Sequence, residues 1–237
     1  MKTLGLILPA AALAAFFGAG YWMAGRTSDV EVRLAALEDV AGIKRAPVDV
    51  PGTIALKNEH SLGSAAAPIA LVVYTDFECP FCAAFNRDEF PTIRKQYVDS
   101  GKLRFSVKLM PVIETHPFAE TAATAAECAG RQGKFFEMHD ALFLNDGPLG
   151  DDAVRTVASQ VGLNGSMLAA CMADGTRPFQ VIEDSNEGRR FEFSGTPSFV
   201  IGPVDSKGMM TVSEHWSGNR RASDIAGMID ELLAAKR

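Results

Sequence analysis

The chain has 237 residues, of which 47% are hydrophobic and 22% charged, and its formal net charge is −6. This composition is that of an ordinary globular protein, and the length suits one large domain or one domain with an insertion. A nucleic-acid partner requires a basic surface, so the acidic balance and the lack of any basic cluster in the sequence exclude that class.

The first segment predicts export. Residues 4–25, LGLILPAAALAAFFGAGYWMAG, carry no charge, and a helix of this length spans about 33 Å, enough to cross a hydrocarbon core. Tyr21 and Trp22 are typical of an interfacial aromatic belt. The run outlasts the usual apolar region of a cleaved signal peptide, so residues 1–26 are expected to be a membrane anchor, with a cleaved signal as the alternative. Either places the remaining chain outside the cytoplasm.

Residues 27–67 are expected to form a juxtamembrane helix and a linker. SDVEVRLAALEDVAG opens with a capping box of Ser28 and Glu31, followed by apolar residues at helical spacing. This helix either pairs with a second copy or serves as a spacer. The prolines, glycines and polar residues that follow indicate a linker, with a short strand near residues 53–56.

The pattern of a folded core begins at residue 68. IALVVYT (69–75) predicts a strand buried on both faces, and the alternating KLRFSVKLM predicts a half-buried strand. The segment between them is mostly helical, with Pro91 expected to kink or divide it. Residues 114–193 look almost entirely helical. PSFVIG and MMTVSEHW then predict two strands, before a final amphipathic helix. The order is βαβ, a helical block, and ββα within residues 68–237.

The motif CPFC places Cys79 and Cys82 at the turn from the first strand to the first helix. Unpaired N–H groups and the helix dipole favour a thiolate there, so Cys79 is expected to be the nucleophile and Cys82 its more buried partner. Pro80 fits the first helical position. The dipeptide Pro80-Phe81 offers no side-chain hydrogen bond or positive charge to the sulfur. Stabilisation of a Cys79 thiolate would then depend on the backbone N–H groups and the helix dipole.

A CxxC motif can also bind a metal or form a structural bridge. A closed zinc site needs four ligands, and no second CxxC or HxxxH accompanies this one, so no metal site is predicted. A two-thiolate Cu(I) site is chemically reasonable, and a structural bridge is the remaining alternative. The motif and the export signal favour redox chemistry.

YTDFECPFC, the later GTPSFVIG and the helical block between them resemble the thioredoxin-fold disulfide oxidoreductases of the DsbA type, particularly their envelope-anchored branch. The resemblance implies an α/β thioredoxin fold with a large helical insertion at 114–193. It implies that Cys79 is the exposed nucleophile and that Thr196-Pro197 is a cis-proline turn facing the cysteines. Substrate is expected to bind at Thr196, Pro197, Pro80 and Phe81.

The sequence departs from the wider fold at one position. Many thioredoxin-fold enzymes carry a buried acid six residues before the first cysteine, where this chain has Val73. Asp76 and Glu78 lie nearer to the sulfur, either as solvated turn residues or as carboxylates that would raise the pKa of Cys79.

Cys128 and Cys171 lie on separate predicted helices of the insertion. In an exported protein the simplest expectation is a disulfide between them, which some members of the resembled family have, and the alternative is two buried free thiols. The segment GKFFEMHDALF resembles the family's cap helix, and His139 within it is expected to be structural.

The sequence therefore predicts an enzyme without a bound cofactor that oxidises dithiols of exported proteins through a Cys79–Cys82 disulfide. Its expected location is the periplasmic side of a bacterial inner membrane, with a membrane redox partner that reoxidises the pair. A disulfide reductase or isomerase of the same fold and a Cu(I)-binding envelope protein are the alternatives.

Overall fold

The computed structural model describes residues 50–56, 60–173 and 178–236. The anchor or signal peptide expected at residues 1–26 and the amphipathic helix expected after it lie outside these ranges. Within them, no helix combines the length and the apolar character needed to cross a membrane. Val50–Arg237 forms one compact unit.

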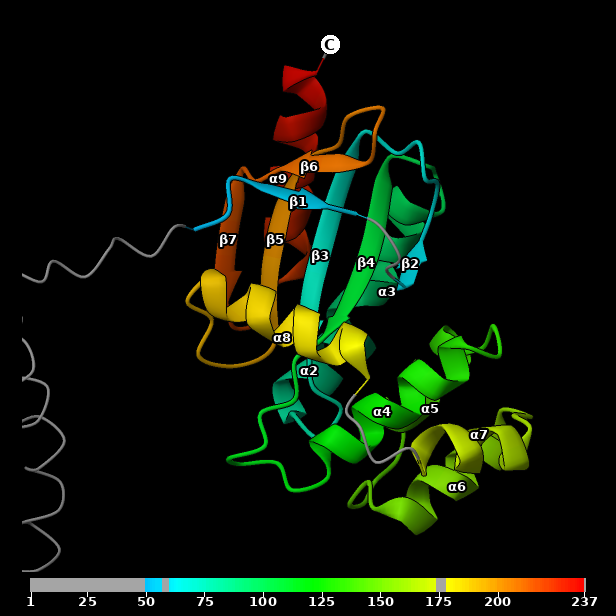
Figure 1. The fold of residues 1–237 in the computed structure, drawn as a ribbon. Helices are drawn as coiled ribbons and strands as arrows, with labels where there is room; N and C mark the ends of the chain where they lie inside the picture. The colour runs from blue at the N-terminus through cyan, green and yellow to red at the C-terminus, as the bar shows by residue number, and fades with distance from the viewer. Residues whose placement is uncertain (1–49, 57–59, 174–177, 237) are drawn as a thin grey trace, which may run out of the picture. The chain divides into compact units, whose positions relative to one another are not determined.

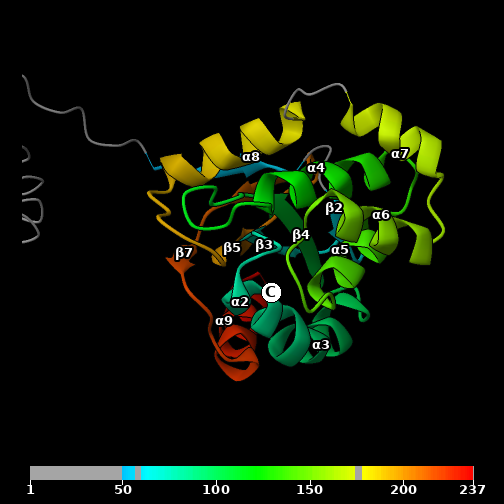
Figure 2. The same ribbon diagram turned by 90° about the horizontal axis from the view of Figure 1, so that it is seen from below.

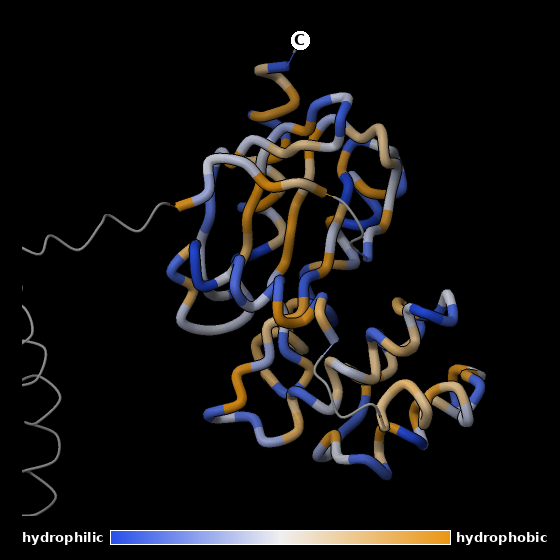
Figure 3. Tube along the Cα trace, in the orientation of Figure 1, coloured by the Kyte–Doolittle hydropathy of each residue, from blue (hydrophilic) through white to orange (hydrophobic). Residues whose placement is uncertain are grey.

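A five-stranded sheet lies at the centre of this unit (Figure 1). Its strand order is β2-β4-β3-β5-β7, with β3 parallel to β4 and the other neighbours antiparallel. The strands are β2 His60–Leu62, β3 Ile69–Thr75, β4 Leu103–Leu109, β5 Ser198–Pro203 and β7 Glu214–Ser217. Every residue of β3 is buried, as its unbroken apolar run predicted. Apolar residues are concentrated along the central strands β3 and β5 in Figure 3.

Helices cover both faces of the sheet (Figure 2). One face carries α8 (Phe179–Arg190), and the other carries the C-terminal helix α9 (Ala222–Ala235) and the helical segment after the cysteines. That segment alternates α and π turns as α2 Pro80–Ala84, η1 Phe85–Glu89, α3 Phe90–Ile93 and η2 Arg94–Val98. Pro91 lies in the first turn of α3. Its missing N–H explains why the regular ladder is divided there.

The alternation of side chains along β3 separates two hydrophobic clusters. Ile69, Leu71 and Val73 belong to the larger cluster, which includes residues of α9 and of the insertion. Ala70, Val72 and Tyr74 belong to the smaller cluster, which includes aromatic residues just after α8. Successive residues of a strand point to opposite faces, so one apolar run supplies both cores.

In the described residues of the insertion between β4 and β5 there are five helices: α4 Ala119–Gly130, α5 Phe135–Phe143, α6 Asp151–Gln160, α7 Gly165–Met172 and α8. Helices α4 to α7 pack together beyond one end of the sheet, and α8 returns across the sheet (Figures 1 and 2). The predicted α/β thioredoxin fold with a helical insertion between its βαβ and ββα halves is confirmed.

Residues expected to form a linker contribute two strands to the fold. The short strand predicted near residues 53–56 is β1, Thr53–Ala55, which pairs with β6, Met209–Thr211, in a separate two-stranded sheet. The edge strand β2 pairs with β4 and was not predicted. Its three residues are too few to show a strand period.

The prediction that MMTVSEHW is one strand is wrong. Its first part is β6, which pairs with β1, and its last part is β7, which pairs with β5 in the main sheet. Gly202 of β5 lies so close to the Thr211 carbonyl that any Cβ there would clash. The chain crosses between the sheets at this contact, where Ser213 N donates to Ile201 O at 2.9 Å.

The prediction that β4 is half-buried is also wrong. Ser106 and Lys108, expected on a solvent-facing side, are 0% and 4% exposed. Helix α8 packs on this face, and its Glu187 pairs with Lys108. Burial of the ammonium group is compatible with folding because a carboxylate accompanies it.

Candidate active site

Cys79 lies where β3 ends and α2 begins. It is the N-cap residue of α2, with extended backbone angles (φ −77°, ψ 118°), and Pro80 is the first helical residue. Its N–H donates to Asp76 O at 3.2 Å, which closes the turn. The N–H groups of Phe81 and Cys82 have no partner in the preceding turn of a helix, so they are available to bind the Cys79 sulfur.

The two thiols of the motif have opposite pKa shifts. The pKa of Cys79 is lowered from 9.0 to about 6, and the hydrogen bond from Cys82 is the largest cause. Desolvation by burial raises this pKa, whereas hydrogen bonds with Thr196 and with the N–H groups of Cys82 and Phe81 lower it further. The pKa of the Cys82 thiol is raised well above its ordinary value, mainly by burial and to a smaller extent by the contact with Cys79. Near neutral pH the arrangement therefore holds Cys79 as a thiolate and Cys82 as a thiol.

The turn before β5 faces this pair. The Thr196–Pro197 peptide bond is cis, as the resemblance implied. In its protonated form, the Cys79 thiol donates to the carbonyl oxygen of Thr196 at 3.1 Å. On the other side of the proline, the Ser198 hydroxyl donates to Gly195 O at 2.7 Å, which holds the turn in place. The structure thus brings together Cys79, Cys82, Thr196 and Pro197 from distant parts of the sequence.

Cys79 differs from the expected exposed nucleophile, because only 4% of its surface is accessible. It is reached through a hollow of about 430 Å³ in the surface beside it. The hollow is lined largely by apolar side chains: Phe77, Pro80, Ala83, Pro117, Phe118, Phe143, Pro148 and Leu149. Phe81 is 65% exposed. A substrate sulfur would therefore approach Cys79 across an apolar surface.

A larger hollow of about 850 Å³ lies among α4, α6 and α7. It shares Pro117 with the hollow beside Cys79 but includes neither cysteine of the motif. The chemistry therefore belongs to the smaller hollow.

Asp76 is not the solvated turn residue that was one alternative. It is 2% exposed, and its carboxylate accepts hydrogen bonds from Glu78 N at 2.8 Å and from Val112 N at 2.7 Å. The same carboxylate contacts His116 Nδ1 at 2.8 Å. Two backbone N–H groups and the His116 ring therefore hold this buried carboxylate in place.

Glu78 also binds the insertion. Its two carboxylate oxygens accept hydrogen bonds from Phe118 N at 2.7 Å and from Leu149 N at 3.3 Å. Both donors belong to residues that line the hollow beside Cys79. The turn before the cysteines therefore fixes two walls of that hollow.

His116 is a candidate that the sequence reasoning missed. The sequence shows it only as one of four scattered histidines, 40 positions from Asp76. Desolvation lowers its pKa, but the hydrogen bond to Asp76 and the charges of Asp76, Cys79 and Glu78 outweigh it, so the net shift is upward. The loop that carries His116 continues into the wall of the hollow at Pro117.

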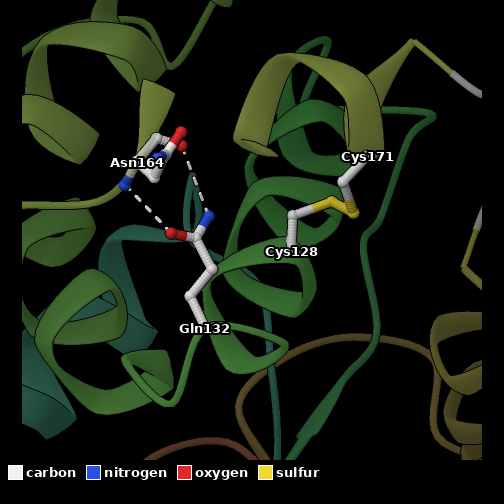
Figure 4. The surroundings of a disulfide bond; sticks show 4 residues. All are labelled: Cys128, Gln132, Asn164 and Cys171. Carbon is white, nitrogen blue, oxygen red and sulfur yellow. Dashed lines mark hydrogen bonds between the residues drawn. A yellow bond between two sulfur atoms is a disulfide. The ribbon is translucent and has the colours of Figure 1, made fainter. Parts of the chain in front are cut away.

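The second cysteine pair lies in the insertion. Cys128 on α4 and Cys171 on α7 form a disulfide with Cα atoms 5.9 Å apart (Figure 4). Beside it, Asn164 N donates to Gln132 Oε1 at 2.9 Å and Gln132 Nε2 donates to Asn164 O at 3.5 Å. These contacts fasten the segment before α7 to the end of α4.

His139 is 3% exposed, pairs with Asp140 and packs against aromatic rings of Phe77 and Phe143. Its surroundings are those of a packed core histidine. Within the part of the chain that the structure describes, no three His, Cys, Asp or Glu side chains gather as a metal site would require.

The fold and the CPFC turn facing a cis-proline define a thioredoxin-like protein. A protein-family model described as Thioredoxin matches residues 55–217. The chain therefore belongs to the thioredoxin family.

Solved structures of DsbA proteins share this fold. The crystal structure of α-DsbA1 from Wolbachia pipientis matches with a TM-score of 0.65 and 24% identity, over 76% of this chain and 93% of that one. Oxidised BdbD from Bacillus subtilis matches with a TM-score of 0.63 and 22% identity, over 78% of this chain and 98% of that one. The expected DsbA-type fold is confirmed.

Curated relatives fall into two kinds. Disulfide bond formation protein D of Bacillus subtilis is 28% identical over 164 residues, which cover 64% of this chain and 71% of that protein. Na⁺/H⁺ antiporter NhaA 1 of Salinispora arenicola is 31% identical over 160 residues, which cover 68% of this chain but 24% of the antiporter. The chain thus spans about a quarter of the antiporter's length, so that likeness concerns one part of the larger protein.

Proposed function

We propose that this chain is a thiol:disulfide oxidoreductase that forms disulfides in exported proteins through Cys79 and Cys82. The observation that carries the proposal is the opposite shift of the two pKa values, with Cys79 lowered to about 6 and Cys82 raised. A stabilised thiolate favours the reduced form of the pair and makes its disulfide a better oxidant.

The reaction is a two-electron exchange. A substrate thiolate attacks the Cys79 sulfur of the Cys79–Cys82 disulfide, forming a mixed disulfide and releasing Cys82 as a thiolate that takes up a proton. The second substrate thiol loses its proton and attacks the substrate sulfur, which forms the substrate disulfide and releases the Cys79 thiolate. Cys79 is the better leaving group because its pKa is the lower of the two.

Substrate is proposed to bind at Thr196, Pro197, Pro80 and Phe81. The Thr196 carbonyl already accepts a hydrogen bond from the Cys79 thiol, so a substrate backbone beside it would lie next to the reacting sulfur. Pro80 lines the hollow, and the exposed ring of Phe81 offers apolar contact to an unfolded client. Exposed apolar surface at a site commonly marks an interaction surface.

The proposed setting is the periplasmic side of a bacterial inner membrane, with residues 4–25 as anchor or signal. This part rests on the uncharged N-terminal sequence and on the likeness to a protein named for disulfide bond formation. A membrane redox partner would reoxidise the Cys79–Cys82 pair after each turnover.

The test is the reduction potential of the Cys79–Cys82 pair in the full chain. The protein is equilibrated in glutathione buffers, and alkylated cysteines are mapped so that Cys128 and Cys171 are scored separately. A potential near about −120 mV, that of a strong oxidant, would support dithiol oxidation. A potential near about −270 mV, that of thioredoxin, would indicate a reductase and refute the proposed direction. Stoichiometric Cu(I) binding without dithiol oxidation would instead support a copper-binding role.

A further inference from the structure

The CPFC motif offers Cys79 no positive side chain, but the fold brings His116 to the turn that carries Cys79. The intervening dipeptide Pro80-Phe81 is uncharged, and the position of the usual buried acid is the apolar Val73. His116 comes from the loop after β4 and is held by the carboxylate of Asp76 at 2.8 Å. Asp76 is three residues before Cys79, and its carbonyl accepts the Cys79 N–H.

The position of His116 is fixed by buried contacts. The Asp76 side chain has no exposed surface, whereas 21% of the His116 side chain is exposed. A second bond from Asp76, to Val112 N, fixes the start of the same loop. Because Nδ1 of His116 faces Asp76, the other ring nitrogen, Nε2, is left for the side of the ring away from the carboxylate.

The loop also borders the hollow beside Cys79. Pro117 and Phe118, the two residues after His116, line the same hollow as Cys79. The charges that act on the imidazole are those of Asp76, Cys79 and Glu78, and all three favour its protonated form. Charge interactions are reciprocal, so an imidazolium that the Cys79 thiolate stabilises must stabilise that thiolate in return.

We infer that His116, held in place by Asp76, is the electrostatic partner of the Cys79 thiolate and makes the Cys79–Cys82 disulfide more oxidising. This inference rests on the proposed redox function of the pair. Asp76 is the positioning residue of this arrangement, because it acts through His116 and the loop. The effect operates where His116 is protonated and Cys79 is ionised, and it is lost as the pH rises above the pKa of the histidine.

The test compares the full chain with the His116→Asn and His116→Arg variants. Asparagine can place a donor near the Nδ1 position and keep the bond to Asp76 without a charge, whereas arginine restores the positive charge. The exposed His215 of β7 provides a matched control in His215→Asn. The readouts are the pKa of Cys79, from thiolate absorbance, and the equilibrium constant with glutathione.

At about pH 7, His116→Asn is expected to lower the equilibrium constant for reduction of the pair by roughly threefold to tenfold, the upper value being equivalent to about 30 mV. The pKa of Cys79 should rise in parallel, His116→Arg should restore both quantities, and His215→Asn should change neither. The wild type and His116→Asn should converge near pH 9, where the imidazole is neutral. A merely structural role would not produce this convergence.

Equal potentials for the wild type and His116→Asn at pH 7 would overturn the inference. Should that variant fail to fold, the wild type alone decides the matter. Salt screens a partly exposed ion pair, so the pKa of Cys79 should rise between low salt and about 1 M salt, and a constant pKa would refute the inference. If the wild-type pair itself fails to oxidise dithiols, the proposed function is at fault instead.

Discussion

Raising the pH from about 5 to about 8 is expected to make the Cys79–Cys82 disulfide more oxidising relative to glutathione. The reduced protein gains an ionised form above about pH 6, the pKa of Cys79, while Cys82 stays protonated. Free thiols ionise only near pH 8.5. The equilibrium constant should therefore be flat below pH 6 and rise about tenfold, or about 30 mV, for each pH unit above it. At pH 7 this ionisation contributes about 1.4 kcal/mol in favour of the reduced pair.

The assay equilibrates the full chain with glutathione at constant ionic strength, followed by acid quenching, alkylation and quantification of labelled Cys79 and Cys82. Cys128 and Cys171 serve as the internal reference because they are joined in a separate disulfide. An equilibrium constant that stays the same from about pH 5 to pH 8 would show that Cys79 does not ionise in this range. The explanation of its oxidising character would then be refuted.

Three further predictions concern single interactions. Cys82→Ala removes the largest cause of the lowered pKa of Cys79, so thiolate absorbance should titrate about one to two pH units higher. Replacing Cys128 and Cys171 with alanine should lower the free energy of unfolding by about 4 kcal/mol in urea titrations, without changing the potential of the other pair. Burial raises the pKa of Asp184 from 3.8 to about 6, so stability from this group is present at low pH and lost as the pH rises. The free energy of unfolding of the wild type should fall by about 3 kcal/mol between about pH 4 and pH 7, and Asp184→Asn should lack this slope.

Features that depend on local chemistry could be predicted from the sequence. The apolar run of β3 and the CPFC turn each carry their signal within a few residues. The cis-proline at Pro197 required the resemblance, because the residues alone favour a trans bond.

Features that depend on distant elements could not be predicted. The alternating sequence of β4 predicted an exposed position for Lys108, but α8 follows about 80 residues later and its Glu187 pairs with Lys108. The contact between Asp76 and His116 likewise exists only because β4 runs parallel to β3 and returns the chain to the same end of the sheet. The hydrophobic periodicity of a short sequence segment cannot predict either contact, because each joins residues that are far apart in the sequence.

Glu78 provides a separate test of whether the insertion and the cysteine turn act as one site. Its carboxylate binds Phe118 N and Leu149 N, which hold two walls of the hollow beside Cys79. Hydrogen bonds to a charged group typically contribute about 1.5–3 kcal/mol. Glu78→Ala should therefore loosen the hollow and raise KM for an unfolded dithiol substrate, with a much smaller change in the Cys79–Cys82 potential.

Glu137→Ala, at an exposed position on α5, is the matched control and should leave KM unchanged. The measurement is steady-state oxidation of a peptide that carries two cysteines and an apolar flank, with the potential determined on the same preparations. If Glu78→Ala changes the potential and leaves KM as in the wild type, then the carboxylate acts on the sulfur and not on the hollow. In that case the insertion would contribute to stability alone, because its two attachments to the turn would not affect how substrate reaches Cys79.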